Sequence, residues 1–343
     1  MIPYGKQDIS NDDIETVIDV LRSEFLTQGP VVPEFEYAVA KQVNAQFGVA
    51  LNSATSALHV ACMALGVGEG DWVWTSSNSF VASANCALYC SAKVSFVDID
   101  PKTYNMDTKK LEQKLELAKT QGTLPKVVIP VHFAGQSCDM KQIKKLSNEY
   151  GFKIIEDASH AIGAKYLGEP VGGCEYSDIA VFSFHPVKII TTAEGGLATT
   201  NDAELAKKMF LFRSHGIIRN NEIAETENDG PWHYKQIELG FNYRMTDLHA
   251  ALGLSQLKRL EDYIQQRHEI AHYYNERFSG TKWTIPYQET FQKSSFHLYV
   301  LKIPKNLVKH KKAVFKNIVD RGIGINVHYI PIHTQPYYSS QNI

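Results

Sequence analysis

The chain has 343 residues, and its 35 lysines and arginines nearly balance its 37 aspartates and glutamates, for a formal net charge of -2. This balance, without a basic run, argues against a nucleic-acid partner, and no apolar segment is long enough to span a bilayer. A chain of this length is expected to form two domains, or one large domain with a smaller companion.

The start of the chain and its cysteines indicate the compartment. The stretch MIPYGKQDIS lacks the basic and apolar regions of a signal peptide, so we expect a cytoplasmic protein. The cysteines are odd in number, scattered and without a C-x-x-C motif, which predicts neither a disulfide framework nor a metal site. We expect reduced, packed thiols at Cys62, Cys86, Cys90, Cys138 and Cys174.

Two helices are predicted first along the chain. Ser10 and Asp13 have the spacing of a capping box and precede apolar residues at helical spacing. Pro33 is suited to the first position of a second helix, which we expect Gly48 to end.

From residue 49 onward, short apolar runs alternate with helical patterns. This alternation predicts an α/β domain built around a mainly parallel sheet. The expected strands cover residues 49–51, 72–75, 94–97, 127–131, 153–156 and 179–184.

The last third of the chain departs from this rhythm. The polar segment 219–230 is expected to be an exposed loop or flap. Thr246 can cap a long helix that continues to Leu260 and connects to a second domain. Strand-like segments at 296–303 and 323–330, with a helical segment between them, suggest a small α/β unit. We therefore predict a large domain at residues 1–254 and a small one at 255–343.

Candidate site residues follow the predicted strands, because ligands of open α/β sheets collect at the carboxyl ends of the strands. After the strand at 49–51, Thr55 and Ser56 begin a helix whose N-terminus can receive a phosphate, although an ordinary helix cap would have the same pattern. Phe80, after the strand at 72–75, could stack on a flat ring or be a core residue.

A carboxylate follows the strand at 153–156. Asp157 could pair with a protonated ring nitrogen and keep an aromatic cofactor electron-poor, or it could cap a helix beginning at Ala158. His160 could hydrogen-bond the other edge of such a cofactor, or it could be a packed core histidine.

One lysine lies among apolar residues in the stretch SFHPVKIITTAEGG. The ammonium group of Lys188, flanked by Val187 and Ile189, would lose hydration on burial, which favours the neutral amine that Schiff-base chemistry needs. A loop lysine in water is the alternative. Ser183, at the end of the preceding strand, could add a phosphate contact. Together, the lysine, the carboxylate, the phosphate cradle and the aromatic residue match what pyridoxal phosphate requires of a protein.

The order of these stretches resembles a known family. NSATSALH, EDASHAIGA, SFHPVKIITTAEGG and ELGFNYRMTDLHAALGLSQL are similar to the DegT/StrS sugar aminotransferases, which are pyridoxal-phosphate enzymes of the aspartate aminotransferase fold, fold type I. The resemblance implies that Lys188 holds the cofactor covalently, that Asp157 pairs with its ring nitrogen and that His160 lies by its ring hydroxyl. It also implies a homodimer with shared sites. The other implied cofactor contacts are Thr55, Ser56 and Ser183 at the phosphate, Phe80 on the ring and Asn242 at the phosphate of the neighbouring subunit.

Further stretches, including LTQGP, IPVHFAGQ, RSHGI and VHYIPIHTQPYY, resemble the branch of this family that works in pseudaminic acid biosynthesis. That resemblance implies a UDP-linked 4-keto sugar as acceptor and L-glutamate as amino donor. Candidates for binding the nucleotide are Arg244, His328 and Tyr329, with Tyr4 and Lys6 as further candidates, and a surface or packing role would suit these residues equally. Related chains continue beyond the position of Tyr338, so the small domain is expected to be truncated.

Several alternatives remain open from the sequence. The cofactor site does not encode the sugar, so the substrate could be another nucleotide-linked keto sugar. A sugar dehydratase of the same fold would have a histidine where Lys188 stands. A nicotinamide-dependent enzyme would need G-x-G-x-x-G after its first strand, where this chain has NSATSA. A catalytically inactive, cofactor-binding relative is the non-enzymatic alternative.

Overall fold

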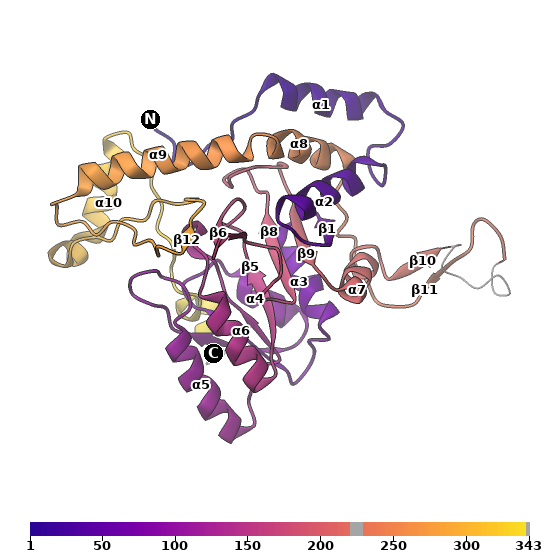
Figure 1. Ribbon diagram of the computed structural model, residues 1–343, viewed down its shortest axis with the longest axis horizontal. Coiled ribbons are helices and arrows are strands. Elements are labelled where there is room, and N and C mark those ends of the chain that lie inside the picture. Colours follow the sequence, from indigo (N-terminus) through magenta and orange to yellow (C-terminus); the bar gives the residue numbers. More distant parts are fainter. Residues whose placement is uncertain (220–228, 341–343) are drawn as a thin grey trace.

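The computed structural model describes residues 1–219 and 229–340. Most of the predicted flap, residues 220–228, lies outside the described residues. The two strands beside it, β10 (Ile217–Arg219) and β11 (Tyr234–Gln236), pair in antiparallel fashion and project from the body of the molecule (Figure 1).

The described part of the chain is organised around a seven-stranded sheet with the order β1-β9-β8-β5-β4-β2-β3. The five strands from β8 to β3 run parallel to one another, whereas β9 is antiparallel to both β8 and β1. The predicted mainly parallel α/β sheet is therefore confirmed. The strands are β1 (Phe47–Leu51), β2 (Trp72–Ser76), β3 (Lys93–Val97), β4 (Val127–Ile129), β5 (Lys153–Asp157), β8 (Ile179–Ser183) and β9 (Gly196–Thr200).

Helices cover both faces of this sheet (Figure 1). One core cluster joins the sheet to α2, α5 and α6, and a second joins it to α3, α4 and α7. Neighbouring residues of β5 divide between the two clusters, Ile154 in the first and Ile155 in the second, as the alternation of side chains along a strand requires. These helices are α2 (Val31–Gln42), α3 (Ala54–Ala64), α4 (Ala82–Tyr89), α5 (Thr108–Gln121), α6 (Met140–Tyr150) and α7 (Ala203–Arg213).

The first helix, α1 (Asn11–Arg22), has the predicted capping box. The Ser10 side chain accepts the backbone N–H of Asp13, and the Asp13 side chain accepts the backbone N–H of Ser10. Two of the helix's otherwise unpaired donors are thereby satisfied.

The second helix begins earlier than its sequence predicts. The buried carboxylate of Asp247 accepts the N–H groups of Val31 and Val32 at 2.8 and 3.2 Å, and this long-range cap starts α2 two residues before Pro33. The prediction that Gly48 ends this helix was wrong, because α2 stops at Gln42 and Gly48 lies in β1.

Beyond the sheet, Thr246 caps α8 (Asp247–Leu257) as predicted, by accepting the N–H of His249 at 3.2 Å. The single long helix expected here is divided, because the chain turns at Lys258 before α9 (Leu260–Phe278) begins. The predicted domain boundary at residue 254 falls within α8, and the division into 1–254 and 255–343 stays a prediction.

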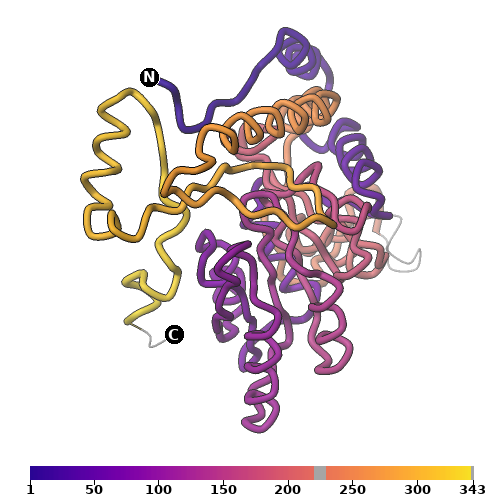
Figure 2. Tube along the Cα trace, turned by 60° about the vertical axis from the view of Figure 1, so that its left-hand side comes forward, coloured from indigo at the N-terminus to yellow at the C-terminus, as the bar shows by residue number. Residues whose placement is uncertain are grey.

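The C-terminal part has one predicted helix, α10 (Lys311–Asp320), and a short α11 (Pro336–Ser339). The predicted strands at 296–303 and 323–330 were wrong. These segments lack a continuous strand partner among the described residues and make only isolated bridges, Lys302 to Thr284 and Ile323 to Ile2. The second bridge places the N-terminal residues beside this part of the chain (Figure 2). Smaller elements are β6 (Lys165–Tyr166), β7 (Glu169–Pro170) and β12 (Gln292–Lys293), which form a three-stranded sheet, and the 3-10 helices Phe133–Gly135, Lys305–His310 and Ile332–Thr334.

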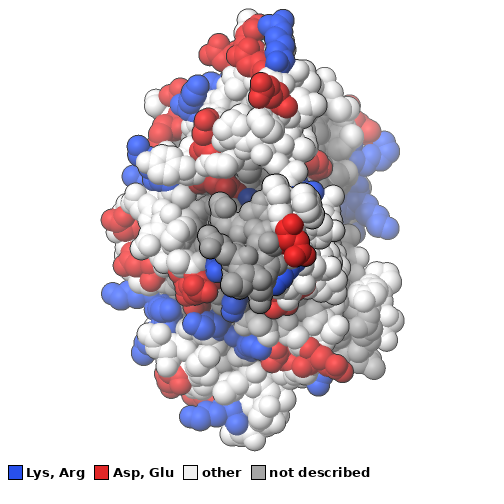
Figure 3. All heavy atoms as spheres, turned by 90° about the vertical axis from the view of Figure 1, so that its right-hand side faces the viewer, with Lys and Arg blue, Asp and Glu red and all other residues white. Residues whose placement is uncertain are grey.

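The surface agrees with the balanced composition. Acidic and basic side chains are interspersed on the face that carries the β10–β11 hairpin (Figure 3). Within residues 1–219 and 229–340, no helix is both long and apolar enough to cross a membrane. All five cysteines are free thiols, four of them buried and Cys90 half-buried.

Candidate active site

The predicted site residues gather where β5 and β8 end. Asp157 is the last residue of β5, and Ser183 is the last residue of the parallel strand beside it. Ser183 is paired with Gly196 of β9. A Cβ atom on Gly196 would lie 2.3 Å from the backbone nitrogen of Ala54, so only glycine lets β9 approach the start of α3 this closely.

The loop before α3 is held by its own side chains. Ser53, rather than Thr55 or Ser56, caps the helix by accepting the N–H of Ser56 at 3.1 Å. The Ser56 hydroxyl donates to Asn52 Oδ1 at 2.7 Å. Thr55 is half-buried in the first turn of α3, where the positive end of the helix dipole favours an anion.

Asp157 is buried and is fixed by two hydrogen bonds. Its Oδ2 accepts the hydroxyl of Ser83 at 2.6 Å, and its Oδ1 accepts the N–H of Ser159 at 3.1 Å. No helix begins at Ala158, so the alternative role of Asp157 as a helix cap is wrong. Hydrogen bonds to both oxygens hold the carboxylate in one orientation at the strand end.

His160 lies close to this carboxylate in the chain and is also buried. Its Nδ1 accepts the N–H of Ala134 at 3.3 Å, which leaves the proton of the neutral ring on Nε2, 3.2 Å from the hydroxyl of Tyr329. Burial, the positive charge of Lys188 and two neighbouring imidazoles lower the pKa of His160 well below its usual value. The ring is therefore neutral at physiological pH.

Lys188 lies in the turn that follows β8, with its backbone N–H donating to the carbonyl of His185 at 2.8 Å. Its neighbours Ile189 and Ile190 are buried. Burial lowers the pKa of the Lys188 amine to about 8, against the opposing attraction of Asp157. A substantial fraction of this amine is therefore neutral near physiological pH, which a lysine in water would not be.

The loop after β2 faces the same region. The ring of Phe80 is 60% exposed, so the alternative that Phe80 is a core residue is wrong. Two residues earlier, Asn78 Oδ1 accepts the N–H of Tyr329 at 3.1 Å. The carbonyl of Ser77 accepts the N–H of Ile332 at 2.9 Å, and the C-terminal segment is thereby docked beside Phe80.

Two of the nucleotide-binding candidates contact each other. The Tyr4 hydroxyl and His328 Nε2 are 2.9 Å apart, and their rings stack with centroids 5.6 Å apart. Burial and the positive charge of Lys188 lower the pKa of His328, so this imidazole is close enough to Lys188 to sense its charge. The N-terminal segment therefore reaches the site, but no hydrogen bond or ion pair of Lys6 is found within the described ranges.

Arg244 and Asn242 lie in a segment that contacts the residues just before α3. Arg244 bridges to Leu51, and the carbonyl of Tyr243 accepts the N–H of Asn52 at 2.8 Å. In the described part of the chain, Nε of Arg244 is buried without a hydrogen-bond partner. Asn242 is exposed, as a residue that reaches a second subunit would be.

Comparison with known proteins identifies the family. The model of the DegT/DnrJ/EryC1/StrS aminotransferase family matches residues 7–343. The chain belongs to this family. It is therefore a pyridoxal-phosphate-dependent sugar aminotransferase, as the resemblance predicted.

Relatives agree along nearly the whole chain. The UDP-4-amino-4,6-dideoxy-N-acetyl-beta-L-altrosamine transaminase of Campylobacter jejuni is 40% identical over 98% of this chain and 86% of its own length. The spore coat polysaccharide biosynthesis protein SpsC of Bacillus subtilis is 38% identical over 99% of this chain and 86% of its own. Among solved structures, Helicobacter pylori PseC, an aminotransferase involved in the biosynthesis of pseudoaminic acid, has a TM-score of 0.90 at 33% identity, covering 99% of this chain and 87% of its own.

The arrangement of side chains fits the cofactor of this aminotransferase family. Lys188 offers a partly neutral amine, Asp157 a buried and oriented carboxylate, and Phe80 an exposed ring. Gly196 lets β9 lie directly against the α3 loop, because a Cβ there would clash with the backbone of Ala54. These are the features that bind an aldehyde, a ring nitrogen, a ring face and a phosphate.

The lowered pKa of Lys188 gives a testable pH dependence. In the cofactor-free chain, the rate of acetylation of Lys188 by acetic anhydride is expected to rise with a midpoint near pH 8, because only the neutral amine reacts. The same shift affects stability. Between pH 8 and 10.5 the Lys188 amine binds fewer protons in the folded chain than in the unfolded chain, so it makes the free energy of unfolding increase with pH over that window. Peptide mass spectrometry of pulse-labelled chain measures the midpoint. A midpoint equal to that of surface lysines in the same digest would contradict the burial argument.

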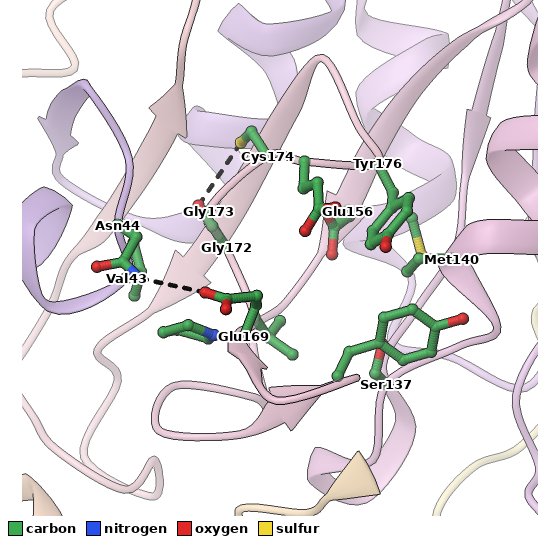
Figure 4. Close-up of a pocket in the computed structure, with 14 residues that line it drawn as sticks. Val43, Asn44, Ser137, Met140, Glu156, Glu169, Gly172, Gly173, Cys174 and Tyr176 are labelled. Atoms are coloured by element: carbon green, nitrogen blue, oxygen red, sulfur yellow. Dashed lines mark hydrogen bonds between the residues drawn. The ribbon is translucent and has the colours of Figure 1, made fainter. Parts of the chain in front are cut away.

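A separate cavity of about 160 Å³ is not part of this site. It is lined by Glu156, Glu169, Cys174 and Tyr176, among others (Figure 4). Because successive side chains of a strand point to opposite faces, Glu156 faces this cavity whereas Asp157 faces away from it.

Two residues of the site were missed from the sequence. Ser83, on α4, donates to Asp157, but a serine within a run of small helical residues gives no signal. His297 has its ring 4.4 Å from the ring of His160. A lone histidine in the mainly apolar stretch FHLYVLKI was the available signal, but the same stretch also has the pattern of a strand.

Proposed function

We propose that the chain transfers an amino group from L-glutamate to C4 of UDP-2-acetamido-2,6-dideoxy-β-L-arabino-hex-4-ulose. The products would be 2-oxoglutarate and UDP-4-amino-4,6-dideoxy-N-acetyl-β-L-altrosamine, in pseudaminic acid biosynthesis. The observation that carries the amino-transfer chemistry is the Lys188 amine, with its pKa lowered to about 8, in the field of the buried Asp157 carboxylate. The Campylobacter jejuni relative, 40% identical over 98% of this chain, supports the choice of sugar.

The proposal gives each side chain a defined task. Lys188 would hold the cofactor, and its amine would take up the proton of the donor's α-carbon. Bound pyridoxal phosphate supplies the electron sink for this proton transfer. Asp157, oriented by Ser83, would pair with the ring nitrogen, and the neutral His160, whose Nδ1 accepts the N–H of Ala134, would offer its Nε2 proton to the ring hydroxyl. Phe80 would stack on the ring, and Thr55, Ser56 and Ser183 would hold the phosphate.

The sugar nucleotide would bind between Arg244 and the N- and C-terminal segments. Arg244, with its buried and unpartnered Nε, suits a pyrophosphate. Three further contacts come from the N- and C-terminal segments, Tyr4, His328 and Tyr329, with Lys6 nearby in the chain. Asn242 would reach the phosphate of a second subunit, so the active unit would be a homodimer with shared sites.

Visible absorbance tests the half-reaction with glutamate first and the reaction with the sugar second. The chain supplied with pyridoxal phosphate should develop the yellow band of a lysine-bound cofactor, and glutamate should convert it to the band of the pyridoxamine form. Adding the UDP-linked 4-keto sugar should restore the first band and yield an amino sugar detectable by mass spectrometry. A folded chain that binds the cofactor but leaves glutamate unchanged would be an inactive relative.

Amination of a different nucleotide-linked keto sugar is the second candidate. It is favoured by relatives of similar coverage, such as the GDP-perosamine synthase of Caulobacter vibrioides, 35% identical over 96% of this chain. A panel of UDP- and GDP-linked 4-keto sugars, each added to the glutamate-treated protein, separates the two. If only a GDP-linked sugar restores the yellow band of the lysine-bound cofactor, that sugar would be the substrate in place of the UDP-linked one.

A further inference from the structure

The backbone around His297 is built with strain. Phe296, directly before it, has φ of 44°, in the left-handed region that a residue with a Cβ rarely adopts. A guanidinium nitrogen of Arg267 holds this turn by donating to the carbonyls of Phe296 and His297 at 3.1 and 3.2 Å. Such strain persists only where the surrounding structure determines it, and it is concentrated at functional sites.

A second set of contacts locks the same turn onto the core of the site. The hydroxyl of Ser295 donates to the carbonyl of His160 at 2.7 Å, and its N–H donates to the carbonyl of Gly135 at 3.0 Å. Gly135, with φ of 102°, has no room for a side chain, since a Cβ would lie 2.4 Å from the Ser295 hydroxyl. As a result the imidazoles of His297 and His160 lie with centroids 4.4 Å apart.

The His297 ring has no hydrogen-bond partner in the described ranges. Its Nδ1 is buried without a hydrogen bond, and no bond to its Nε2 is found there. A buried polar group left unpaired is costly, and an unpaired group in a rigid, strained setting calls for a partner that is bound during function. Together with burial, the positive charges of Lys188 and Arg267 help to lower the pKa of the His297 imidazole, so it lies near both cations.

The charges around His297 indicate the partner's chemistry. The Arg267 guanidinium is partly buried, and residues 1–219 and 229–340 contain no ion pair between it and a carboxylate. His160 and His328, which also face Lys188, are imidazoles whose lowered pKa values keep them neutral. A group bound at His297 would therefore meet positive charge that is only partly compensated, which favours an anion.

We propose that His297 contacts the substrate of the amino transfer and binds a carboxylate group of the amino donor. This inference rests on the proposed function and adds to it a residue that selects a dicarboxylic amino acid. The imidazole N–H donates to the carboxylate, and Arg267 supports the site from the backbone side of His297. The keto sugar, which has no carboxylate, does not use this contact.

The test compares two variants with a surface control. His297→Phe keeps a flat ring against His160 but removes both nitrogens, and His297→Gln keeps a polar side chain. His272→Phe, at a position of α9 whose side chain is 77% exposed, is the matched control. For each protein, calorimetry gives the dissociation constant of 2-oxoglutarate, and absorbance gives the affinity for pyridoxal phosphate and the KM for glutamate in the half-reaction without sugar.

His297→Phe is expected to weaken 2-oxoglutarate binding and raise the KM for glutamate by roughly tenfold or more, the loss of one hydrogen bond to a charged group. Cofactor affinity and the KM for the keto sugar should stay within about twofold of the parent, and His297→Gln should recover part of the loss. The assignment would be overturned if His297→Phe left the KM for glutamate unchanged, raised the KM for the sugar, or weakened cofactor binding as much as it weakened 2-oxoglutarate binding. A parent chain that binds no 2-oxoglutarate would overturn it as well. Because the half-reaction uses no sugar, failure to aminate the UDP-sugar would defeat the proposed substrate and leave the His297 result standing.

Discussion

Lys188→Ala should lose amino transfer by at least about a thousandfold, because in the proposed mechanism one side chain both anchors the cofactor and carries the proton. Its half-buried place after β8 lowers the pKa of the amine to about 8, and alanine has no group that can take over either task. The purified variant should also lack the yellow band of the lysine-bound cofactor. Both the rate of glutamate conversion and the absorbance spectrum measure the effect.

The control for this variant is Lys309→Ala, which removes an exposed lysine of the 3-10 helix Lys305–His310. It should match the parent in rate and spectrum. Circular dichroism and the unfolding temperature of Lys188→Ala should stay close to those of the parent, since a partly buried amine costs desolvation energy that alanine does not. A folded Lys188→Ala protein with appreciable turnover would rule out Lys188 as the anchor.

Asp157→Asn is expected to lower amino transfer on the order of a hundredfold or more, by removing a buried charge without changing the shape of the side chain. The amide oxygen of asparagine can still accept the Ser83 hydroxyl that now donates to Asp157 at 2.6 Å. The ring nitrogen of the cofactor would lose its anionic partner, and with it the electron-poor ring on which proton removal depends.

The same variant has a second signature in the cofactor-free chain. Since Asp157 raises the pKa of the Lys188 amine, its neutral replacement should move the acetylation midpoint of Lys188 below pH 8. Ser83→Ala is the matched control, because it removes the hydrogen bond and keeps the charge, so it should leave this midpoint near its parent value. Normal turnover together with an unshifted midpoint in Asp157→Asn would show that this carboxylate does not face the site.

The predictable part of the fold is the part specified locally. The parallel strands were found because each is a short apolar run. The N-terminal ends of α1 and α8 were found because Ser10 and Thr246 accept N–H groups of residues close to them in the chain. The start of α2 could not be found in this way. Its cap, Asp247, lies more than two hundred residues further along the chain. The helix propensities of the residues around Val31 therefore cannot predict where α2 starts.

The candidate site divides along the same line. Asp157 and Lys188 were predicted because each follows a buried strand, where parallel topology brings side chains together. His297 and Ser83 were missed because their role depends on tertiary contacts, the Arg267 clamp for one and the Asp157 carboxylate for the other. The strand predicted at 296–303 was wrong for the same reason. An apolar run predicts a strand whether or not a neighbouring strand is present to pair with it.

The sheet order also determines when the site can be assembled during synthesis. In the seven-stranded sheet of the described residues, β1 is an edge strand beside β9, and its first residue, Phe47, is matched with Thr200. The β1–β9 pairing, which joins β1 to the rest of the sheet, therefore cannot form until about two hundred residues have left the ribosome. Contacts between such distant segments form slowly, because the intervening loop must close first. A nascent chain stopped before β9 would leave β1 without its strand partner, and chaperone occupancy on this protein should fall only once Thr200 has emerged.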